Sequence, residues 1–261
     1  MMHLEQGHLY HIFNQGNNKQ QIFFKRENYL FFLSKIKEYI LPHSNIVAWC
    51  LMPNHFHLMV EVKEVTIEFA KNGAKSSDGV TQSHPVTNCP ITHRTLNESI
   101  GIMLRSYTRA INKQQNRTGG LFREETKAEC ISKASNITPS FYNTEFGASM
   151  HTNHPEEEYP QVCFNYIHLN PVKACLVNVA EKWEFSSYRD YCGLRNGKLV
   201  DNDCAQRFGI SAASVVGARF QVALPLLDRR LKVNRDSLSE REAISIKIIQ
   251  YTAQPHVAQE P

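Results

Sequence analysis

Two histidines separated by one residue, His55 and His57, are the side chains whose type and spacing first suggest chemistry. They belong to an apolar stretch, residues 47–62, with Pro53 and Asn54 at its middle, and this pattern predicts a β-hairpin. Neighbouring side chains of a strand point to opposite faces, so both imidazoles share one face. The alternating apolar residues are then expected in the core: Phe56, Leu58, Val60 and Val62. Two neutral imidazoles at this spacing form half of a metal site.

The spacing alone leaves other interpretations open, because two polar residues on a solvated strand face would show the same pattern. Metallo-β-lactamases and cupins also use such a pair, but the companion residues that they need are missing. Met59 and Val60 stand where a metallo-β-lactamase would need Asp and His. A metal hydrolase that combines the two histidines with Glu61 remains an alternative.

A second candidate pair, Tyr166 and Asn170, lies in residues 164–173. On a helix, residues four apart share a face, so a phenol would stand beside an amide, as a nucleophile beside a metal ligand. The alternative is an amphipathic helix whose tyrosine packs and whose asparagine caps the end before Pro171, and helical spacing alone favours this alternative. We expect the helix to end before Pro171, since proline disfavours helical geometry in the residue before it.

Taken together, the two motifs are more specific than either alone. The stretch Leu-Met-Pro-Asn-His-Phe-His, followed much later by Tyr-Ile-His-Leu-Asn-Pro-Val-Lys-Ala, resembles the single-tyrosine HUH transposases, and most of all the branch that includes the REP-associated tyrosine transposases. Other stretches of the chain also match the family, in the order in which the family carries them: residues 11–18, 22–24, 106–109, 120–122 and 183–188. The resemblance implies an α+β fold in which a ferredoxin- or RRM-like antiparallel sheet is backed by helices.

The resemblance also implies a function: metal-dependent cleavage and rejoining of single-stranded DNA, on hairpin-forming inverted repeats, by a DNA transposase. His55, His57 and Asn170 match the ligands of a Mg²⁺ or Mn²⁺ ion, which would stabilise charge on the phosphoryl oxygens. Tyr166 matches the nucleophile, whose attack leaves a 5′-phosphotyrosine and a free 3′-OH. A free phenol has a pKa near ~10, so it needs help to lose its proton at neutral pH. Single-stranded or hairpin DNA is the expected partner, and a homodimer is compatible with the resemblance.

Tyr107 is the rival nucleophile, but its spacing with other apolar residues of a predicted helix, residues 97–117, favours a core position. The same helix carries four cations at successive steps of four: Arg105, Arg109, Lys113 and Arg117. Such a stripe either binds DNA phosphates or forms a solvated face, and the sequence leaves both open. Lys173, directly after the second motif, is a further candidate for DNA contact.

Two departures from the family pattern concern DNA binding. Glu124 and Glu125 stand where the family usually carries basic and aromatic residues. The alternative function is therefore a DNA-hairpin-binding protein that does not cleave, such as a domesticated or degenerate copy. Residues 205–211 have some features of a helix-turn-helix, but Gly217 in the would-be recognition helix makes this interpretation the weaker one.

The resemblance implies a transposase-like domain over residues 8–194, and the remaining residues, 195–261, are expected to form a helical C-terminal extension with a helix at 239–251. Another helix is expected at 28–40. Two polar stretches, residues 63–97 and 132–158, lack any period that buries a face, and we expect them to be mobile loop insertions.

Composition bounds these interpretations. The chain has 261 residues, a net charge of +4, 42% hydrophobic and 21% charged residues, which suffices for a core and argues against a wholly disordered protein. No apolar run approaches the ~18 residues of a membrane span, and no secretory signal is visible. The seven cysteines are scattered and never form a C-x-x-C pair, as expected in a reducing cytoplasm. Together with the resemblance to transposases, this predicts a bacterial cytoplasmic, nucleoid-associated protein.

Overall fold

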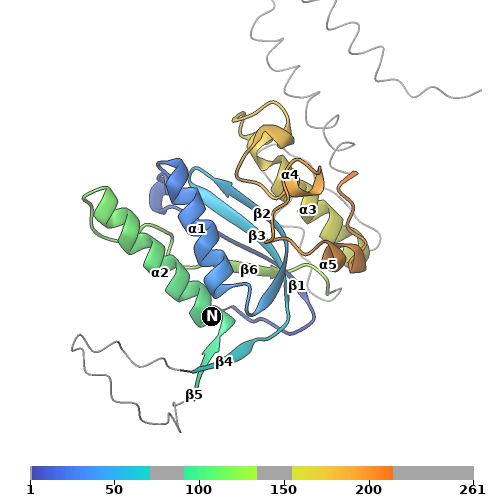
Figure 1. Cartoon of the computed structure of the whole chain (residues 1–261), viewed down its shortest axis with the longest axis horizontal. Helices are drawn as coiled ribbons and strands as arrows, with labels where there is room; N and C mark the ends of the chain where they lie inside the picture. Colours follow the sequence, from blue (N-terminus) through green and yellow to red (C-terminus); the bar gives the residue numbers. More distant parts are fainter. Residues whose placement is uncertain (1, 71–90, 134–154, 214–261) are drawn as a thin grey trace, which may run out of the picture. The chain divides into compact units, whose positions relative to one another are not determined.

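A four-stranded antiparallel sheet with the strand order β2-β3-β1-β6 organises the chain. The computed structural model describes residues 2–70, 91–133 and 155–213 (Figure 1). The strands of the sheet are β1 (Leu9–Gln15), β2 (Ser44–Met52), β3 (His55–Val62) and β6 (Lys127–Cys130). The helices are α1 (Arg26–Tyr39), α2 (Leu96–Gln114), α3 (Pro155–Lys173), α4 (Tyr188–Tyr191) and α5 (Asn202–Arg207). Short 3-10 turns occur at Asn17–Lys19 and Ala180–Lys182.

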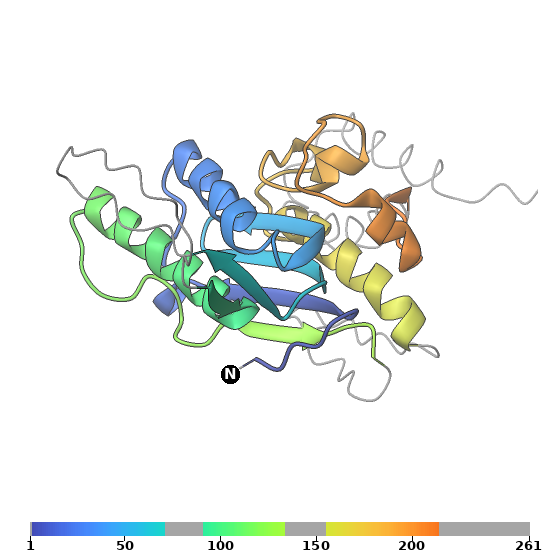
Figure 2. The ribbon, with the colours of Figure 1, turned by 60° about the horizontal axis from the view of Figure 1, so that its bottom comes forward.

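The sheet has helices on both faces. Helices α1 and α2 cover one face, and α3 lies along the other (Figures 1 and 2). The expected fold class, an α+β antiparallel sheet backed by helices, is therefore confirmed. The helices expected over 28–40 and 97–117 are α1 and α2, each shifted by one to three residues.

The predicted hairpin is confirmed as β2 and β3, which pair in register from Ser44 opposite Val62 to Met52 opposite His55, around the turn at Pro53 and Asn54. A register irregularity lies between Ile46 and Ala48. The predicted alternation also holds. The first set of side chains belongs to the core under α1 and α2: Phe56, Leu58, Val60 and Val62.

The core between the sheet and α1 and α2 is apolar and rich in aromatic rings. Phe32 of α1 contacts Phe56 of β3 at a centroid distance of 5.1 Å and Tyr107 of α2 at 4.9 Å. Tyr107 is fully buried, and its hydroxyl donates to the Ile22 carbonyl at 2.9 Å. The prediction that Tyr107 is a core residue is confirmed.

The other face of the sheet is not solvated, because α3 covers it. Helix α3 buries residues on several sides, including Tyr159, Cys163, Phe164 and Ile167, as expected of a helix enclosed between two layers. The predicted end before Pro171 is wrong: the helix continues to Lys173 with Pro160 and Pro171 inside it. Pro171 removes one N–H donor, but the Ala174 N–H still donates to the Asn170 carbonyl at 2.9 Å and closes the last turn.

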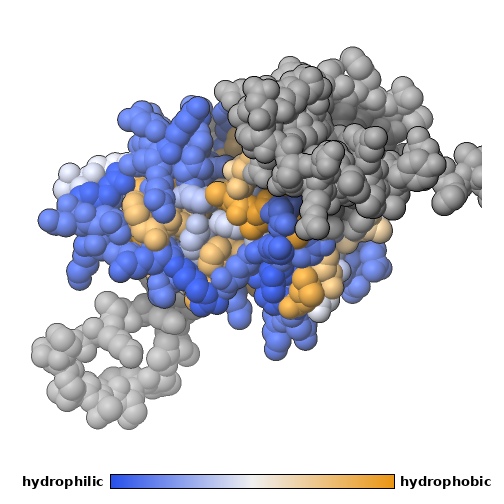
Figure 3. Space-filling model, turned by 90° about the horizontal axis from the view of Figure 1, so that it is seen from above, coloured by the Kyte–Doolittle hydropathy of each residue, from blue (hydrophilic) through white to orange (hydrophobic). Residues whose placement is uncertain are grey.

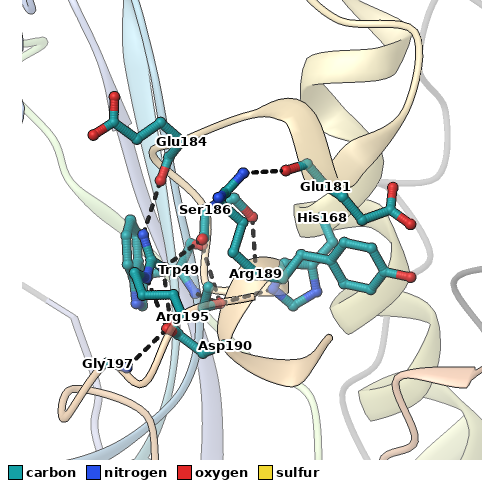
Figure 4. A network of polar contacts seen from close by, with 11 residues as sticks. Trp49, His168, Glu181, Glu184, Ser186, Arg189, Asp190, Arg195 and Gly197 are labelled. Atoms are coloured by element: carbon teal, nitrogen blue, oxygen red, sulfur yellow. Dashed lines mark hydrogen bonds and ion pairs between the residues drawn. The ribbon is translucent and has the colours of Figure 1, made fainter. Parts of the chain in front are cut away.

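The layer outside α3 is tied to β2 by a polar network (Figure 4). Ser187 donates to the Trp49 carbonyl at 3.2 Å and receives the Trp49 N–H at 2.9 Å, so His168 of α3, at 2.7 Å, also donates to it. Arg195 bonds Asp190 at 2.7 Å and lies over the Trp49 ring at 5.0 Å. These bonds hold the side of α3 that carries His168, and they thereby fix the orientation of the side that faces the sheet.

The interpretation of residues 63–97 as one loop is wrong at both ends. Antiparallel strands β4 (Thr66–Ala70) and β5 (Ile91–Thr95) form a ribbon, and α2 starts directly after it with a capping box made by Thr95 and Glu98. Cross-strand pairing from Thr66 opposite Thr95 to Ala70 opposite Ile91 builds this ribbon. Likewise, residues 155–158, expected in the second loop, begin α3.

Several expectations lie outside the described residues: the centres of both insertions (71–90 and 134–154), the helix at 239–251 and the second half of the helix-turn-helix. Residues beyond 194 also pack on the sheet, since the Asp201 N–H donates to the Ile46 carbonyl at 2.9 Å and Cys204 of α5 contacts Glu61 at 3.2 Å.

The exposed large apolar residues of the described part are Leu30, Leu176 and Leu194. Figure 3 shows one face, on which orange apolar patches lie among hydrophilic side chains. No helix among the described residues is long and apolar enough to cross a membrane. The six cysteines in these ranges are all free.

Candidate functional site

The candidate site lies between the middle strands of the sheet and α3. In β3 the residues that share the α3 face include His55 and His57, and in β1 this face carries His11, because Phe13 stands opposite His57 and Gln15 opposite His55. His57 retains 4% of its surface exposed and His11 only 1%, whereas His55 is half-buried. The site is therefore a buried row of imidazoles that opens toward the hairpin turn.

Each imidazole of the pair is held at its Nδ1 atom. His55 Nδ1 lies 2.6 Å from Asn54 Oδ1, and His57 Nδ1 lies 2.9 Å from His11 Nε2. The Asn54 amide is itself oriented by its Nδ2, which donates to the Lys19 carbonyl at 3.3 Å. The Nε2 atoms of His55 and His57 are consequently the ones that face α3.

Helix α3 brings Asn170 between the two Nε2 atoms. Asn170 Oδ1 lies 3.3 Å from His55 Nε2, and Asn170 Nδ2 lies 3.2 Å from His57 Nε2, although 113 residues separate Asn170 from His57. Asn170 is 9% exposed, so this contact is largely shielded from water. The three predicted metal-ligating residues thus converge.

Tyr166 lies one helical turn before Asn170 and joins the same cluster. Its ring stands edge-on to His57 at a centroid distance of 5.4 Å and to His11 at 6.0 Å. Its hydroxyl bonds the Asn170 side chain. Lys173 approaches from the end of α3, with its Nζ 5.3 Å from the Tyr166 ring centroid. The predicted nucleophile and the predicted ligands therefore share one site.

Burial dominates the electrostatics of the cluster. It lowers the pKa of His11 to about 3, lowers that of His57 well below its ordinary value, and lowers that of His55 against the opposing effect of the Asn170 bond. All three rings are therefore neutral at pH 7, the form that binds metals. Burial likewise lowers the pKa of the Lys173 ammonium group.

Burial also raises the pKa of the Tyr166 phenol, while its bond with Asn170 lowers it. The negative charge of Glu129 adds to the rise. Glu129 stands opposite His11 on β6, and its Oε2 is buried without a hydrogen-bond partner among the described residues. Burial and the nearby Glu129 carboxylate therefore favour the protonated form of the Tyr166 phenol.

The predicted DNA contacts fall into two places. Lys173 lies at the site, whereas Arg105, Arg109 and Lys113 are exposed on α2. Arg105 and Arg109 line a groove of about 1160 Å³ between α2 and residues 119–129. The groove also contains Glu124 and Glu125, so its charge is mixed.

Two competing assignments do not fit the geometry. Tyr107 is enclosed in the core on the other side of the sheet, away from any imidazole of the pair. Glu61 stands at the far end of β3, where it bonds Asn45 at 2.8 Å and Arg207 at 2.7 Å, so it cannot complete a hydrolase site with His55 and His57. These contacts of Glu61 exclude the metal hydrolase that the sequence left open as an alternative.

The sequence analysis assigned no role to His11 and Glu129, which the structure places beside the pair. Their positions follow from the pairing of β1 with β3 and β6, which the sequence does not encode locally. Two signals were available for His11: an imidazole in an apolar strand, and its place at the start of residues 11–18, which match the family pattern. No cluster of three or more His, Cys, Asp and Glu residues arranged for a metal occurs in the described ranges, so the donor set here is two imidazoles and an amide.

No family model matches the chain, and no curated protein matches it. Among solved structures, the chain is similar to one described as a REP-associated tyrosine transposase bound to a REP hairpin. The TM-score is 0.43 and the sequence identity 16%, over 77% of this chain and 92% of that one.

Proposed function

We propose that the chain cleaves and rejoins single-stranded DNA, as the transposases that its motifs resemble do, with Tyr166 as the nucleophile. The observation that carries the proposal is the convergence of Tyr166 and Asn170 of α3 with His55 and His57 of β3 in one shielded cluster. These residues lie far apart in the sequence, and packing of an ordinary core gives no reason for them to meet.

The donor set fits a divalent cation. Asn54 Oδ1 can only accept, so the proton of neutral His55 lies on Nδ1, and His55 Nε2 then presents a lone pair to Asn170 Oδ1 at 3.3 Å. Two lone pairs that face each other are unfavourable unless a cation lies beside them. His55, His57 and Asn170 would hold Mg²⁺ or Mn²⁺, with water and phosphate as the remaining ligands. The cation would stabilise charge on the scissile phosphate.

The residues of the chain have separate tasks in this proposal. Tyr166 attacks the phosphorus atom and is joined to the 5′ side, while the 3′ oxygen leaves. Asn170 orients the phenol through its side-chain bond, and Lys173 adds positive charge near the ring. Burial alone opposes ionisation of the phenol, and a bound cation would favour it. The proton that the phenol loses passes to water, and the departing 3′ oxygen takes up a proton to become the free 3′-OH.

A denaturing gel tests the proposal. The full chain is incubated with end-labelled hairpin DNA that carries a single-stranded flank, in Mn²⁺ and in EDTA. We expect a covalent protein–DNA species in Mn²⁺ that is absent in EDTA and absent for His55→Ala. The alternative function, a hairpin-binding protein that does not cleave, predicts retardation in native gels only. Covalent product of equal amount in EDTA would refute the metal site.

A further inference from the structure

His11 contacts the candidate site without belonging to its predicted ligands. It enters from β1, is 1% exposed, and places its Nε2 atom 2.9 Å from His57 Nδ1. The two rings are stacked, with centroids 5.1 Å apart and planes inclined by 23°. Phe13 stacks on the other side of His11 at 4.7 Å, so packing fixes the orientation of the ring.

A contact between two ring nitrogens holds one proton when both imidazoles are neutral. Both rings are enclosed, with 1% of the surface of His11 and 4% of that of His57 exposed. If His11 donated, the proton of His57 would lie on its Nε2 and would point at Asn170 Nδ2, itself a donor, at 3.2 Å. If His57 donates, its Nε2 carries a lone pair that accepts from Asn170 Nδ2 or binds a cation. Only the second arrangement gives the contact between His57 and Asn170 one donor and one acceptor.

We propose that His11 is a positioning residue: it accepts the Nδ1–H of His57 and thereby keeps the Nε2 lone pair of His57 directed at Asn170 and at a cation bound beside it. The cation belongs to the proposed function, on which this half of the inference rests. The tautomer of His57 is independent of it. Groups that bond the outer nitrogen of a ligating histidine commonly change metal affinity by about 10- to 100-fold when removed.

A hydrogen bond from His57 to His11 also determines where the proton of His11 lies. A neutral ring that accepts at Nε2 carries its proton on Nδ1.

Two variants separate the hydrogen bond from the packing. His11→Phe fills the space but has no acceptor, whereas His11→Gln can place an oxygen near the former Nε2 atom. His43→Phe is the matched control, because His43 is also buried and bonded, to Ser99 at 2.8 Å and to the Glu64 carbonyl at 2.9 Å, at the opposite end of the sheet. Circular dichroism melts show which variants are folded.

The first measurement is the affinity for Mn²⁺ without DNA, followed by the electron paramagnetic resonance signal of the free ion. We expect His11→Phe to bind Mn²⁺ about 10- to 100-fold more weakly than the wild type, and His11→Gln and His43→Phe to bind close to it. Wild-type affinity in folded His11→Phe would overturn the inference. Absence of Mn²⁺ binding in the wild type would instead overturn the metal site of the proposed function.

The second measurement needs no metal, and its decisive result comes from the wild-type protein. Nitrogen-15 spectra of histidine-labelled wild-type protein at pH 7, assigned with His57→Gln, report which ring nitrogen carries the proton. We expect the Nδ1–H form for His57, and a partial shift to the Nε2–H form in His11→Phe. A His57 that is protonated on Nε2 in the wild type would overturn the inference, whatever the outcome with Mn²⁺.

Discussion

The two faces of the four-stranded sheet are both buried, but they are built from different chemistry. The face under α1 and α2 is a continuous apolar layer, with Phe32, Phe56 and Tyr107 in contact. The face under α3 buries His11, His57 and Asn170, and it holds the Tyr166 ring against them. Burial of a polar group costs free energy unless the group is bonded, so the second face needs a reason that the first does not.

The comparison is sharpest for two tyrosines on helices of equal length. Tyr107 and Tyr166 both lie in nineteen-residue helices, α2 and α3. The hydroxyl of Tyr107 donates its hydrogen bond to the Ile22 carbonyl, and this bond accounts for the buried hydroxyl without any polar side chain. The hydroxyl of Tyr166 bonds an amide that also touches both histidines. The setting of a residue, more than its type or its spacing, thus separates a packed tyrosine from a candidate nucleophile.

The largest expected effect comes from exchanging these two hydroxyls for hydrogen. Tyr166→Phe keeps the ring and its packing, so folding and DNA binding should persist while the covalent DNA adduct disappears completely. Tyr107→Phe should leave the adduct intact and lower the free energy of unfolding by about 1 kcal/mol, the value of one hydrogen bond. Peptide mapping of trapped adduct checks both. An adduct on Tyr107, or on any residue other than Tyr166, would contradict the proposed mechanism.

The second effect compares adjacent residues of β3 that point to opposite faces. Phe56 is fully buried among Phe32 and Phe122, and Phe56→Ala should cost about 3–5 kcal/mol of unfolding free energy. His55 is half-buried, and His55→Ala should cost about 1 kcal/mol, since it loses the hydrogen bond with Asn54 and little packing. Urea titrations measure both values. Equal costs would mean that the two faces contribute alike to stability.

The apolar face was predictable from the sequence, and the polar face only in part. Alternation in β3 and helical spacing in α1 and α2 assign the apolar residues to one face, because local periodicity determines which side chains point together. In α3 the period is weak, since the helix is enclosed by the sheet and by the layer around Ser187. The motif resemblance, and not the period, indicated Tyr166 and Asn170.

Two features escaped prediction for physical reasons. The role of His11 depends on the register of β1 against β3, and register is a property of strand pairing that no single segment carries. The continuation of α3 past Pro171 depends on tertiary packing, which outweighs the loss of one backbone hydrogen bond. Local rules fail in both cases at or beside the candidate site, where polar and strained features concentrate.

The third expected effect is a pH dependence of the free energy of unfolding, caused by a buried histidine of α3. Burial lowers the pKa of His168 from 6.5 to about 3, so between these values the unfolded chain binds a proton that the folded chain does not. The stabilisation is present above pH 6.5 and is lost as the pH falls, by up to about 1.4 kcal/mol per pH unit for one imidazole. His168→Gln keeps a donor for Ser187 but does not titrate.

Urea unfolding at pH 7, 6 and 5 measures this slope. The stability of His168→Gln should fall less steeply than that of the wild type, by about the contribution of one imidazole. His93→Gln is a suitable control, because His93 is exposed on β5 and its side chain is 63% accessible. If the slopes of His168→Gln and the wild type coincided, His168 would not be buried in its neutral form.

The smallest expected effect is on the salt dependence of DNA binding, which would show which side of the sheet the DNA backbone follows. Lys173 lies at the α3 site, whereas Arg109 lines the groove beside α2. If single-stranded DNA contacts both, Lys173→Gln and Arg109→Gln should each reduce the slope of log K against log salt by about 0.7, the value for one phosphate contact. Arg26→Gln is the control, since Arg26 is paired with Glu184 at 2.6 Å.

A changed slope for Lys173→Gln alone would confine the DNA to the α3 face and leave the cationic stripe of α2 as a solvated surface. A changed slope for Arg109→Gln alone would place the DNA backbone away from Tyr166, and that result would contradict the proposed cleavage at this site.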